Sequence, residues 1–297
     1  MNRSLEVIKN IYKPYRYTIK GNVTVLETTS GDFAVKEKNT KIKDLYEYLK
    51  SRNFEYFPQL VDSSRNDLDV FEYIKEVDTP LEQKGNDLVD LVSLLHNKTT
   101  YYKEVSEDTY KEIYENIKSN IDDLMYYYNN LYEIYFLDEF MSPSTYLLMR
   151  NISKLFSALK FCESELDNWY DLVKDEKKQR VCLVHNNLDL SHFLKSRQSY
   201  LISWEKAKVD TPVVDMVNFY KNEFFNLDFS SLLKKYFSKY EYNDSEKKLF
   251  FILISLPEKV AINEHEFESV KNIRKSLDYI MKTEDLVRPY YAVNKEK

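Results

Sequence analysis

Two long stripes of apolar and aromatic residues constrain the fold of this chain more than any other feature of its sequence. The first stripe recurs at intervals of three and four and comprises Tyr110, Tyr114, Ile117, Ile121, Leu124, Tyr128, Leu131 and Tyr135. The second stripe has the same spacing and comprises Leu148, Ile152, Leu155, Leu159, Cys162, Leu166, Trp169 and Val173. Each stripe therefore covers one face of an α-helix. Because a short segment containing Pro143 joins them, they predict an antiparallel helix hairpin over about residues 105–176.

The first 75 residues have the alternation that is typical of β-structure. Runs of β-branched and aromatic residues predict strands near 17–19, 23–26, 33–36, 60–61 and 69–74. One helix is expected over 41–52, with Ile42, Leu45, Tyr46 and Leu49 on one face. This order predicts a small antiparallel sheet with a helix packed on it.

Residues beyond about 80 are predicted to be helical, with an interruption at 181–205. Asn86 is the expected N-cap of a helix over 87–96, and further helices are expected from 213 and over 228–240, 245–255 and 266–282. Residues 181–184 and 200–204 have the composition of short strands on either side of a polar loop. The sequence therefore predicts an α+β protein with domains at 1–75 and 76–297.

Composition excludes several classes of function. The chain has 297 residues and only three glycines, which excludes a Walker phosphate loop, a GxGxxG dinucleotide turn and a GxSxG nucleophile elbow. A formal net charge of -6 disfavours nucleic acid as a partner. No segment approaches the roughly 20 apolar residues of a membrane helix, and the N-terminal segment lacks the apolar core of a signal peptide. We therefore expect a cytoplasmic protein with no membrane span, in which Cys162 and Cys182 are buried thiols.

The polar loop and the residues after it carry most of the candidate chemistry. The loop runs His185-Asn186-Asn187-Leu188-Asp189-Leu190-Ser191-His192, and Ile202-Ser203-Trp204-Glu205 and Asp210-Thr211-Pro212-Val213-Val214-Asp215 follow it. This layout resembles the aminoglycoside phosphotransferase and choline kinase superfamily, which has HGDxxxxN in its catalytic loop, then IDW or IDF, then DPxxDLA at a helix start. The resemblance extends over about residues 15–225, since Phe33-Ala34-Val35-Lys36, the helix at 41–52 and residues 71–74 and 91–96 match earlier landmarks in the same order.

The resemblance implies a two-lobed protein-kinase-like fold. Its N-lobe would be a small antiparallel sheet, and its larger, mainly helical C-lobe would carry the long antiparallel helix hairpin and a degenerate catalytic loop at 181–205. ATP with Mg²⁺ is the implied cofactor. Lys36 and its helix partner Glu47 match the cofactor-binding positions, while His185 and Asp215 match the structural pair that ties the catalytic loop to the next helix.

Three reactive positions of the family are replaced in this chain. Asn187 stands at the catalytic base, and its amide cannot accept a proton near neutral pH. His192 and Ser203 stand at the metal-binding positions, where Mg²⁺ prefers charged oxygen ligands. Each loss costs about 10²–10⁴-fold in rate. We therefore predict a catalytically impaired pseudokinase that binds ATP and Mg²⁺ weakly or not at all and acts through binding or through assembly with protein partners.

Two alternatives remain open. An active ATP-dependent phosphotransferase for an alcohol or amine would use displaced acids, with Asp189 as base and Glu205 as metal ligand. A purely structural module would have a closed cleft. An open polar cleft between Lys36 and Glu205 would favour the enzyme, whereas salt-bridged acids or a cleft filled by aromatic side chains would favour a scaffold.

A narrower resemblance concerns the spore-coat, CotS-like branch of the superfamily. It is carried by residues 190–194, 203–206 and 215–220 and by Leu256-Pro257-Glu258-Lys259. This resemblance implies incorporation into a spore coat.

Overall fold

The computed structural model of the chain describes residues 3–65, 67–262 and 265–292. Internal contacts divide the chain into two units, each made of two separate stretches of sequence. The first unit comprises Met1–Thr99 and Leu183–Lys208, and the second comprises Thr100–Cys182 and Val209–Lys297.

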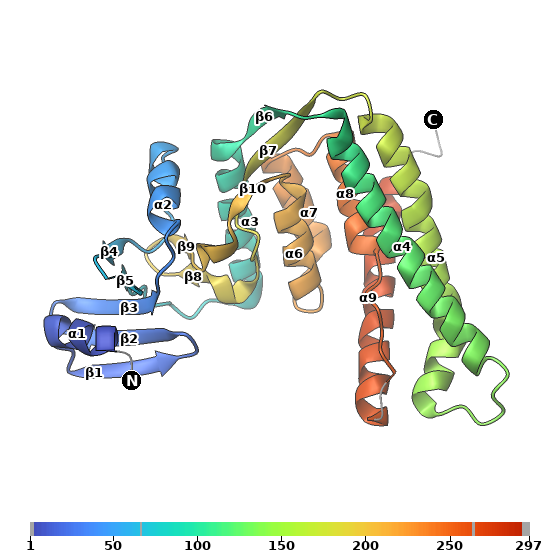
Figure 1. Ribbon diagram of the computed structural model, residues 1–297, viewed down its shortest axis with the longest axis horizontal. Coiled ribbons are helices and arrows are strands. Elements are labelled where there is room, and N and C mark those ends of the chain that lie inside the picture. Colours follow the sequence, from blue (N-terminus) through green and yellow to red (C-terminus); the bar gives the residue numbers. More distant parts are fainter. Residues whose placement is uncertain (1–2, 66, 263–264, 293–297) are drawn as a thin grey trace. The chain divides into compact units, whose positions relative to one another are not determined.

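A five-stranded antiparallel sheet forms the base of the first unit (Figure 1). Its spatial order is β1 (Arg16–Lys20), β2 (Val23–Thr28), β3 (Gly31–Glu37), β5 (Leu68–Glu72) and β4 (Leu60–Asp62). Gly21 makes the turn between β1 and β2 with a φ of +57°, a conformation that a glycine adopts without steric cost. On β3, Lys36 lies opposite Asp69 of β5, so the register fixes the position of this lysine.

Two helices accompany the sheet, and one of them was not expected. Helix α2 (Ile42–Ser51) matches the predicted helix, whereas α1 (Arg3–Tyr12) is an additional helix. Ile8 of α1 is fully buried in a cluster with Leu26, Val35 and Val70. The spacing of Leu5, Ile8 and Tyr12 is helical, and it is the signal that could have revealed α1.

The remaining elements of the first unit include α3 (Leu81–Thr99), β8 (Phe193–Lys195) and β9 (Ser199–Leu201). Two short 3₁₀ helices, η1 (Leu190–His192) and η2 (Trp204–Lys206), flank this hairpin. The predicted start of α3 is wrong, because the helix begins five residues before Asn86. The side chain of Asn86 donates to the carbonyl of Glu82 at 2.9 Å, a bond typical of a helix interior rather than of an N-cap.

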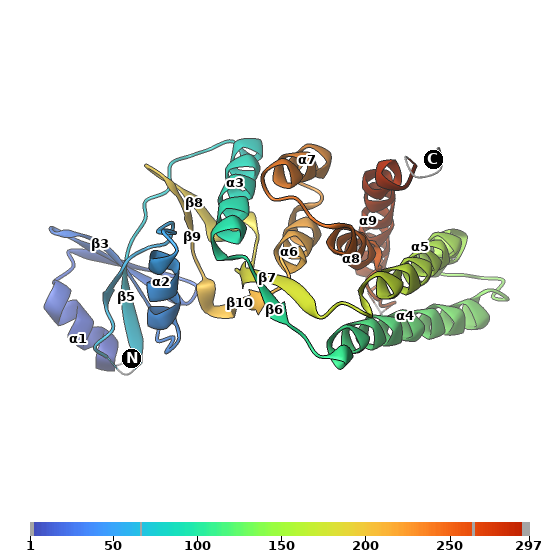
Figure 2. The same ribbon diagram turned by 90° about the horizontal axis from the view of Figure 1, so that it is seen from above.

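The predicted helix hairpin is the largest feature of the second unit. Helices α4 (Glu107–Tyr135) and α5 (Pro143–Val173) lie side by side in both views (Figures 1 and 2). Ser142 caps α5 by accepting a hydrogen bond from the backbone N–H of Thr145 at 3.3 Å. Every residue of the second predicted stripe is buried, so the stripe's function is packing.

Four further helices and three strands complete the part of the chain that the structure describes. The helices are α6 (Val213–Glu223), α7 (Phe229–Lys239), α8 (Asp244–Ser255) and α9 (Glu266–Ala292), and the strands are β6 (Tyr101–Glu104), β7 (Lys178–Val184) and β10 (Lys208–Asp210). Helices α8 and α9 both pack against α5. Helix α9 continues ten residues past its predicted end. Among the described residues, no helix combines the length and the apolar character needed to cross a membrane.

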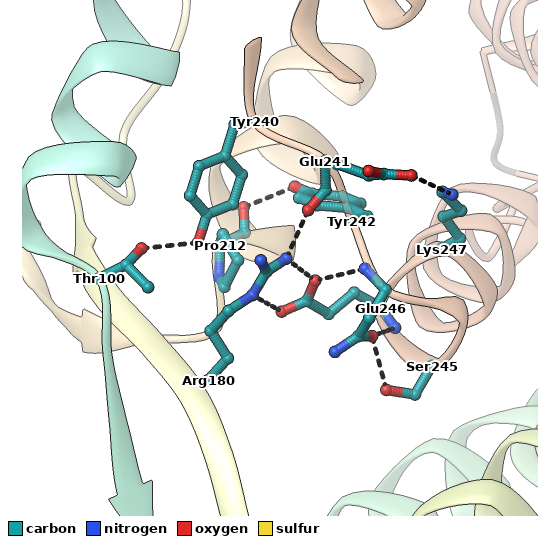
Figure 3. A network of polar contacts seen from close by, with 10 residues as sticks. Thr100, Arg180, Pro212, Tyr240, Glu241, Tyr242, Ser245, Glu246 and Lys247 are labelled. Atoms are coloured by element: carbon teal, nitrogen blue, oxygen red, sulfur yellow. Dashed lines mark hydrogen bonds and ion pairs between the residues drawn. The ribbon is translucent and has the colours of Figure 1, made fainter. Parts of the chain in front are cut away.

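A network of polar contacts joins β7 to the start of α8 in the second unit (Figure 3). Arg180 of β7 binds both carboxylate oxygens of Glu246, with an Nε–Oε1 distance of 2.8 Å, and also donates to the carbonyl of Glu241. Glu246 in turn accepts from the backbone N–H of Asn243, which completes a capping box on α8. Both members of the ion pair are mostly buried.

Candidate functional site

A cavity of about 290 Å³ lies within the first unit. Most of its wall is apolar and comes from β2, β3, β5, β8 and the segments that follow β5 and β9, namely Val23, Val25, Ala34, Phe71, Ile74, Leu194 and Ile202. Lys36, Ser203 and Glu205 add polar groups to the same lining. The volume is near the lower end of the ~300–1,000 Å³ that small-molecule sites occupy.

Lys36 is, together with Lys20, one of the lysines in the lining of this cavity. Its Nζ donates to Oε1 of Glu205 at 3.1 Å and approaches Oγ of Ser203 at 3.5 Å. Its side chain is 23% exposed, so its charge is partly shielded from water. The predicted helix partner, Glu47, is exposed on α2 and does not line the cavity, so the structure pairs Lys36 with Glu205.

The segment 203–205 places Glu205 beside Lys36 through an unusual backbone conformation. Ser203 has φ and ψ of 65° and 53°, in the left-handed region that few non-glycine residues occupy. Trp204 follows and is almost fully buried. Its indole N–H donates to the carbonyl of Leu201 at 2.8 Å, and its ring meets His185 edge to face at 4.8 Å. This buried ring fixes the direction in which the next side chain, Glu205, leaves the backbone.

The environment of Glu205 favours its charged form. Burial raises the pKa of its carboxyl, but the hydrogen bond from its own backbone N–H and the nearby Lys36 outweigh burial and hold the pKa below the ordinary 4.5. Glu205 is therefore ionised at neutral pH and neutralises Lys36.

Replacement of Glu205 by glutamine should flatten the pH dependence of stability on the acid side. Because the pKa of Glu205 is lower in the folded state, its contribution to stability is present above pH 4.5 and is lost as the pH falls through the folded value. The difference in free energy of unfolding between wild type and Glu205→Gln should therefore shrink below pH 4.5. Urea denaturation at a series of pH values measures it, and a difference independent of pH would contradict the assignment.

Three other predicted site residues, Asn187, Asp189 and His192, contact one another in the loop before β8. Oδ1 of Asp189 accepts from the backbone N–H and hydroxyl of Ser191 and from the backbone N–H of His192, at 2.6, 2.5 and 3.1 Å. Asp189 is thereby the N-cap of η1. Nδ1–H of His192 donates to the carbonyl of Asn187 at 2.7 Å and lies 3.2 Å from Oδ2 of Asp189. The three side chains hold the loop in shape.

Lys206 and Tyr46 are neighbours of the site that the sequence analysis did not single out. Lys206 donates to Oδ1 of Asn187 at 3.2 Å, which places a cation beside the position of the family's catalytic base. Tyr46 lines the cavity from α2, and burial raises the pKa of its phenol, with Glu205 adding to the rise. Its helical spacing with Ile42 and Leu49 suggested packing alone.

The two residues predicted to be structural are both fully buried. Nε2–H of His185 donates to the carbonyl of Ile202 at 2.8 Å, which holds the start of the polar loop against the segment that leads to Ser203. Asp215 lies in the first turn of α6, where the helix dipole favours a negative charge. A direct interaction between His185 and Asp215 remains a prediction.

Comparisons with known proteins identify the fold. No family model and no curated protein sequence matches the chain. Among solved structures, the aminoglycoside phosphotransferase from Alicyclobacillus acidocaldarius is similar with a TM-score of 0.68 and 11% identity, over 93% of this chain and 92% of that one. A spectinomycin phosphotransferase in its AMP-bound complex is similar with a TM-score of 0.59 and 12% identity, over 95% and 97%. The predicted α+β, protein-kinase-like fold is therefore confirmed, since these phosphotransferases have the same fold.

The residues present do not fit the magnesium that this fold implies. Mg²⁺ prefers oxygen ligands and is usually held by one or two carboxylates together with phosphates and waters. At the two positions that the resemblance assigns to the metal, Ser203 is neutral and His192 offers nitrogen, while the nearby carboxylate of Glu205 is engaged by Lys36. Among the described residues, no group of three or more His, Cys, Asp or Glu side chains has an arrangement that could hold a metal ion.

Proposed function

We propose that the protein is a pseudokinase that binds a nucleotide in the cavity beside Lys36 and acts through binding or assembly. The observation that carries this proposal is the combination of an apolar cavity with Lys36 in its lining and the replacement of the acids that would serve catalysis. Apolar walls suit a flat base, and a partly buried ammonium group suits a phosphate. The resemblance of residues 190–194 to the spore-coat branch adds a spore coat as the setting of this role.

The contacts of the acidic residues disfavour an active phosphotransferase. Asp189, the substitute base, already accepts three hydrogen bonds through one oxygen and has His192 beside the other. Glu205, the substitute metal ligand, is salt-bridged to Lys36 at 3.1 Å. Both arrangements match the expectation for a scaffold. The cavity itself disfavours the closed-cleft module, because about 290 Å³ remains between its walls.

Nucleotide binding is tested by titrating the protein with ATP, ADP and GTP, with and without Mg²⁺, in a thermal-shift assay and by calorimetry. A nucleotide at 100 times its dissociation constant should stabilise the fold by about 2.7 kcal/mol and raise the melting temperature by a few degrees. Lys36→Ala should bind at least about tenfold more weakly, because a charge-assisted hydrogen bond contributes about 1.5–3 kcal/mol. Lys50→Ala, which removes an exposed lysine from α2, is the matched control and should bind as wild type does.

The same nucleotide titration with the Glu205→Gln variant provides a second test. The substitution frees Lys36 from its competing carboxylate, so nucleotide affinity should rise. Absence of a shift with every nucleotide would overturn the proposal. A shift that needs Mg²⁺ and is accompanied by phosphate transfer to an alcohol or amine would replace it with the enzyme.

A further inference from the structure

The end of the helix hairpin exposes a set of large apolar side chains. We call it the hairpin tip, and it consists of Ile134, Phe136, Leu137 and Phe140, which are 65%, 55%, 84% and 88% exposed. These residues lie at the end of α4 and in the connection to α5 (Figure 1). Apolar side chains gathered on a surface in this way mark interaction sites.

The hairpin tip carries charge of one sign. Between Lys118 and Arg150 the sequence has five acidic residues and no lysine or arginine. Glu133, Asp138 and Glu139 lie among the apolar residues of the tip and are all exposed. A partner for this surface must therefore combine apolar side chains with positive charge.

The first unit carries a surface of that description along strand β1. We call it the basic edge, and it consists of the exposed residues Lys13, Tyr15, Arg16, Tyr17, Ile19 and Lys20. Tyr15 and Ile19 are 70% and 66% exposed. Residues 5–20 contain four cations and one acid. Strand β1 is the outermost strand of its sheet and pairs only with β2 among the described residues, so its outer side is open to another chain.

We propose that the hairpin tip of one copy of this chain docks on the basic edge of a second copy. Two tips repel each other through their acids, and two edges repel each other through their cations. The charges therefore favour contact between a tip and an edge. Such a contact is heterologous, because it joins different surfaces of the two copies. Repeated from copy to copy it produces closed rings or open filaments. Of the tip and the edge, Lys20 alone lines the cavity beside Lys36, and none of the residues substituted below lines it.

Sedimentation velocity over a range of protein concentrations tests the proposal without nucleotide, so its failure is distinct from failure of nucleotide binding. The average mass of the wild type should rise with concentration at low salt. At about 1 M salt, where the Debye length is ~3 Å, association should weaken at least tenfold. Leu137→Ser with Phe140→Ser should weaken it at least tenfold at low salt.

Charge reversal gives the decisive comparison. Asp138→Lys with Glu139→Lys reverses the tip, and Lys13→Glu with Arg16→Glu reverses the edge. Each double variant should be monomeric alone, because its two surfaces then carry charge of the same sign. An equal mixture should assemble again, since reversed tip meets reversed edge and native tip meets native edge. Recovery on mixing cannot come from misfolded protein.

Lys271→Glu with Arg274→Glu, which reverses two exposed charges on α9, is the control and should assemble as wild type does. A wild type that stays monomeric at the highest soluble concentration would overturn the proposal. It would also be overturned by a wild type that associates while the mixture of the reversed variants remains monomeric.

Discussion

Replacement of Glu246 by alanine should lower the free energy of unfolding by about 3–5 kcal/mol, the usual cost of removing one partner of a buried ion pair. Glu246 is 8% exposed and binds Arg180, which is 17% exposed, through both carboxylate oxygens. The variant leaves the guanidinium group of Arg180 without its anion and also removes half of the capping box on α8. Urea denaturation at neutral pH measures the loss.

An exposed ion pair on another helix provides the control for this prediction. Glu284 and Arg288 pair on α9 with about two thirds of each side chain exposed, so Glu284→Ala should change stability by less than about 1 kcal/mol. Equal effects of the two substitutions would show that the Arg180–Glu246 network contributes no more than a surface contact.

Trp204→Ala should destabilise the first unit by about 3–5 kcal/mol, the range for truncation of a large buried aromatic side chain. The indole is 2% exposed and packs edge to face with His185, Phe54 and Phe57. Its loss should also release Glu205 from its place beside Lys36. Thermal denaturation measures the first effect and nucleotide titration of the folded variant measures the second.

Trp204→Phe separates the packing of this ring from its hydrogen bond. The phenyl ring retains much of the buried area but cannot donate to the carbonyl of Leu201. The loss of that bond should cost about 0.5–1.5 kcal/mol, plus a cavity contribution from the smaller ring. A Trp204→Ala variant as stable as wild type would show that the segment 203–205 is held by its backbone alone.

The fold could be predicted largely from periodicity. The stripes at 110–135 and 148–173 specified two helices because their spacing has the period of an α-helix, and the alternation before residue 75 specified strands. The start of α3 could not be read correctly, because asparagine is favoured at N-caps and Asn86 satisfies its side chain inside the helix instead. Strand β6 was not predicted because its residues are exposed and lack alternation.

The candidate site was predicted less completely than the fold. Lys36 and Glu205 were named from their places in the sequence, but their mutual ion pair depends on the left-handed backbone at Ser203. Sequence patterns carry no signal for such a conformation in a serine. Asp189 was considered as a base, and its hydrogen bonds to η1 could not be inferred because Asp is equally common in turns and in active sites.

The division of the chain into two units has a consequence for its synthesis. Residues 100–182 separate the two stretches that make up the first unit. The ends of these two stretches meet where the backbone N–H of Leu183 donates to Oγ1 of Thr99 at 3.1 Å. During translation, the first 99 residues must wait for residues 183–208 before Trp204 and Glu205 can complete the unit. The hairpin of α4 and α5 leaves the ribosome in that interval, and the contacts between its two helices are local in sequence. The first unit can therefore reach its final packing only after the hairpin has been synthesised.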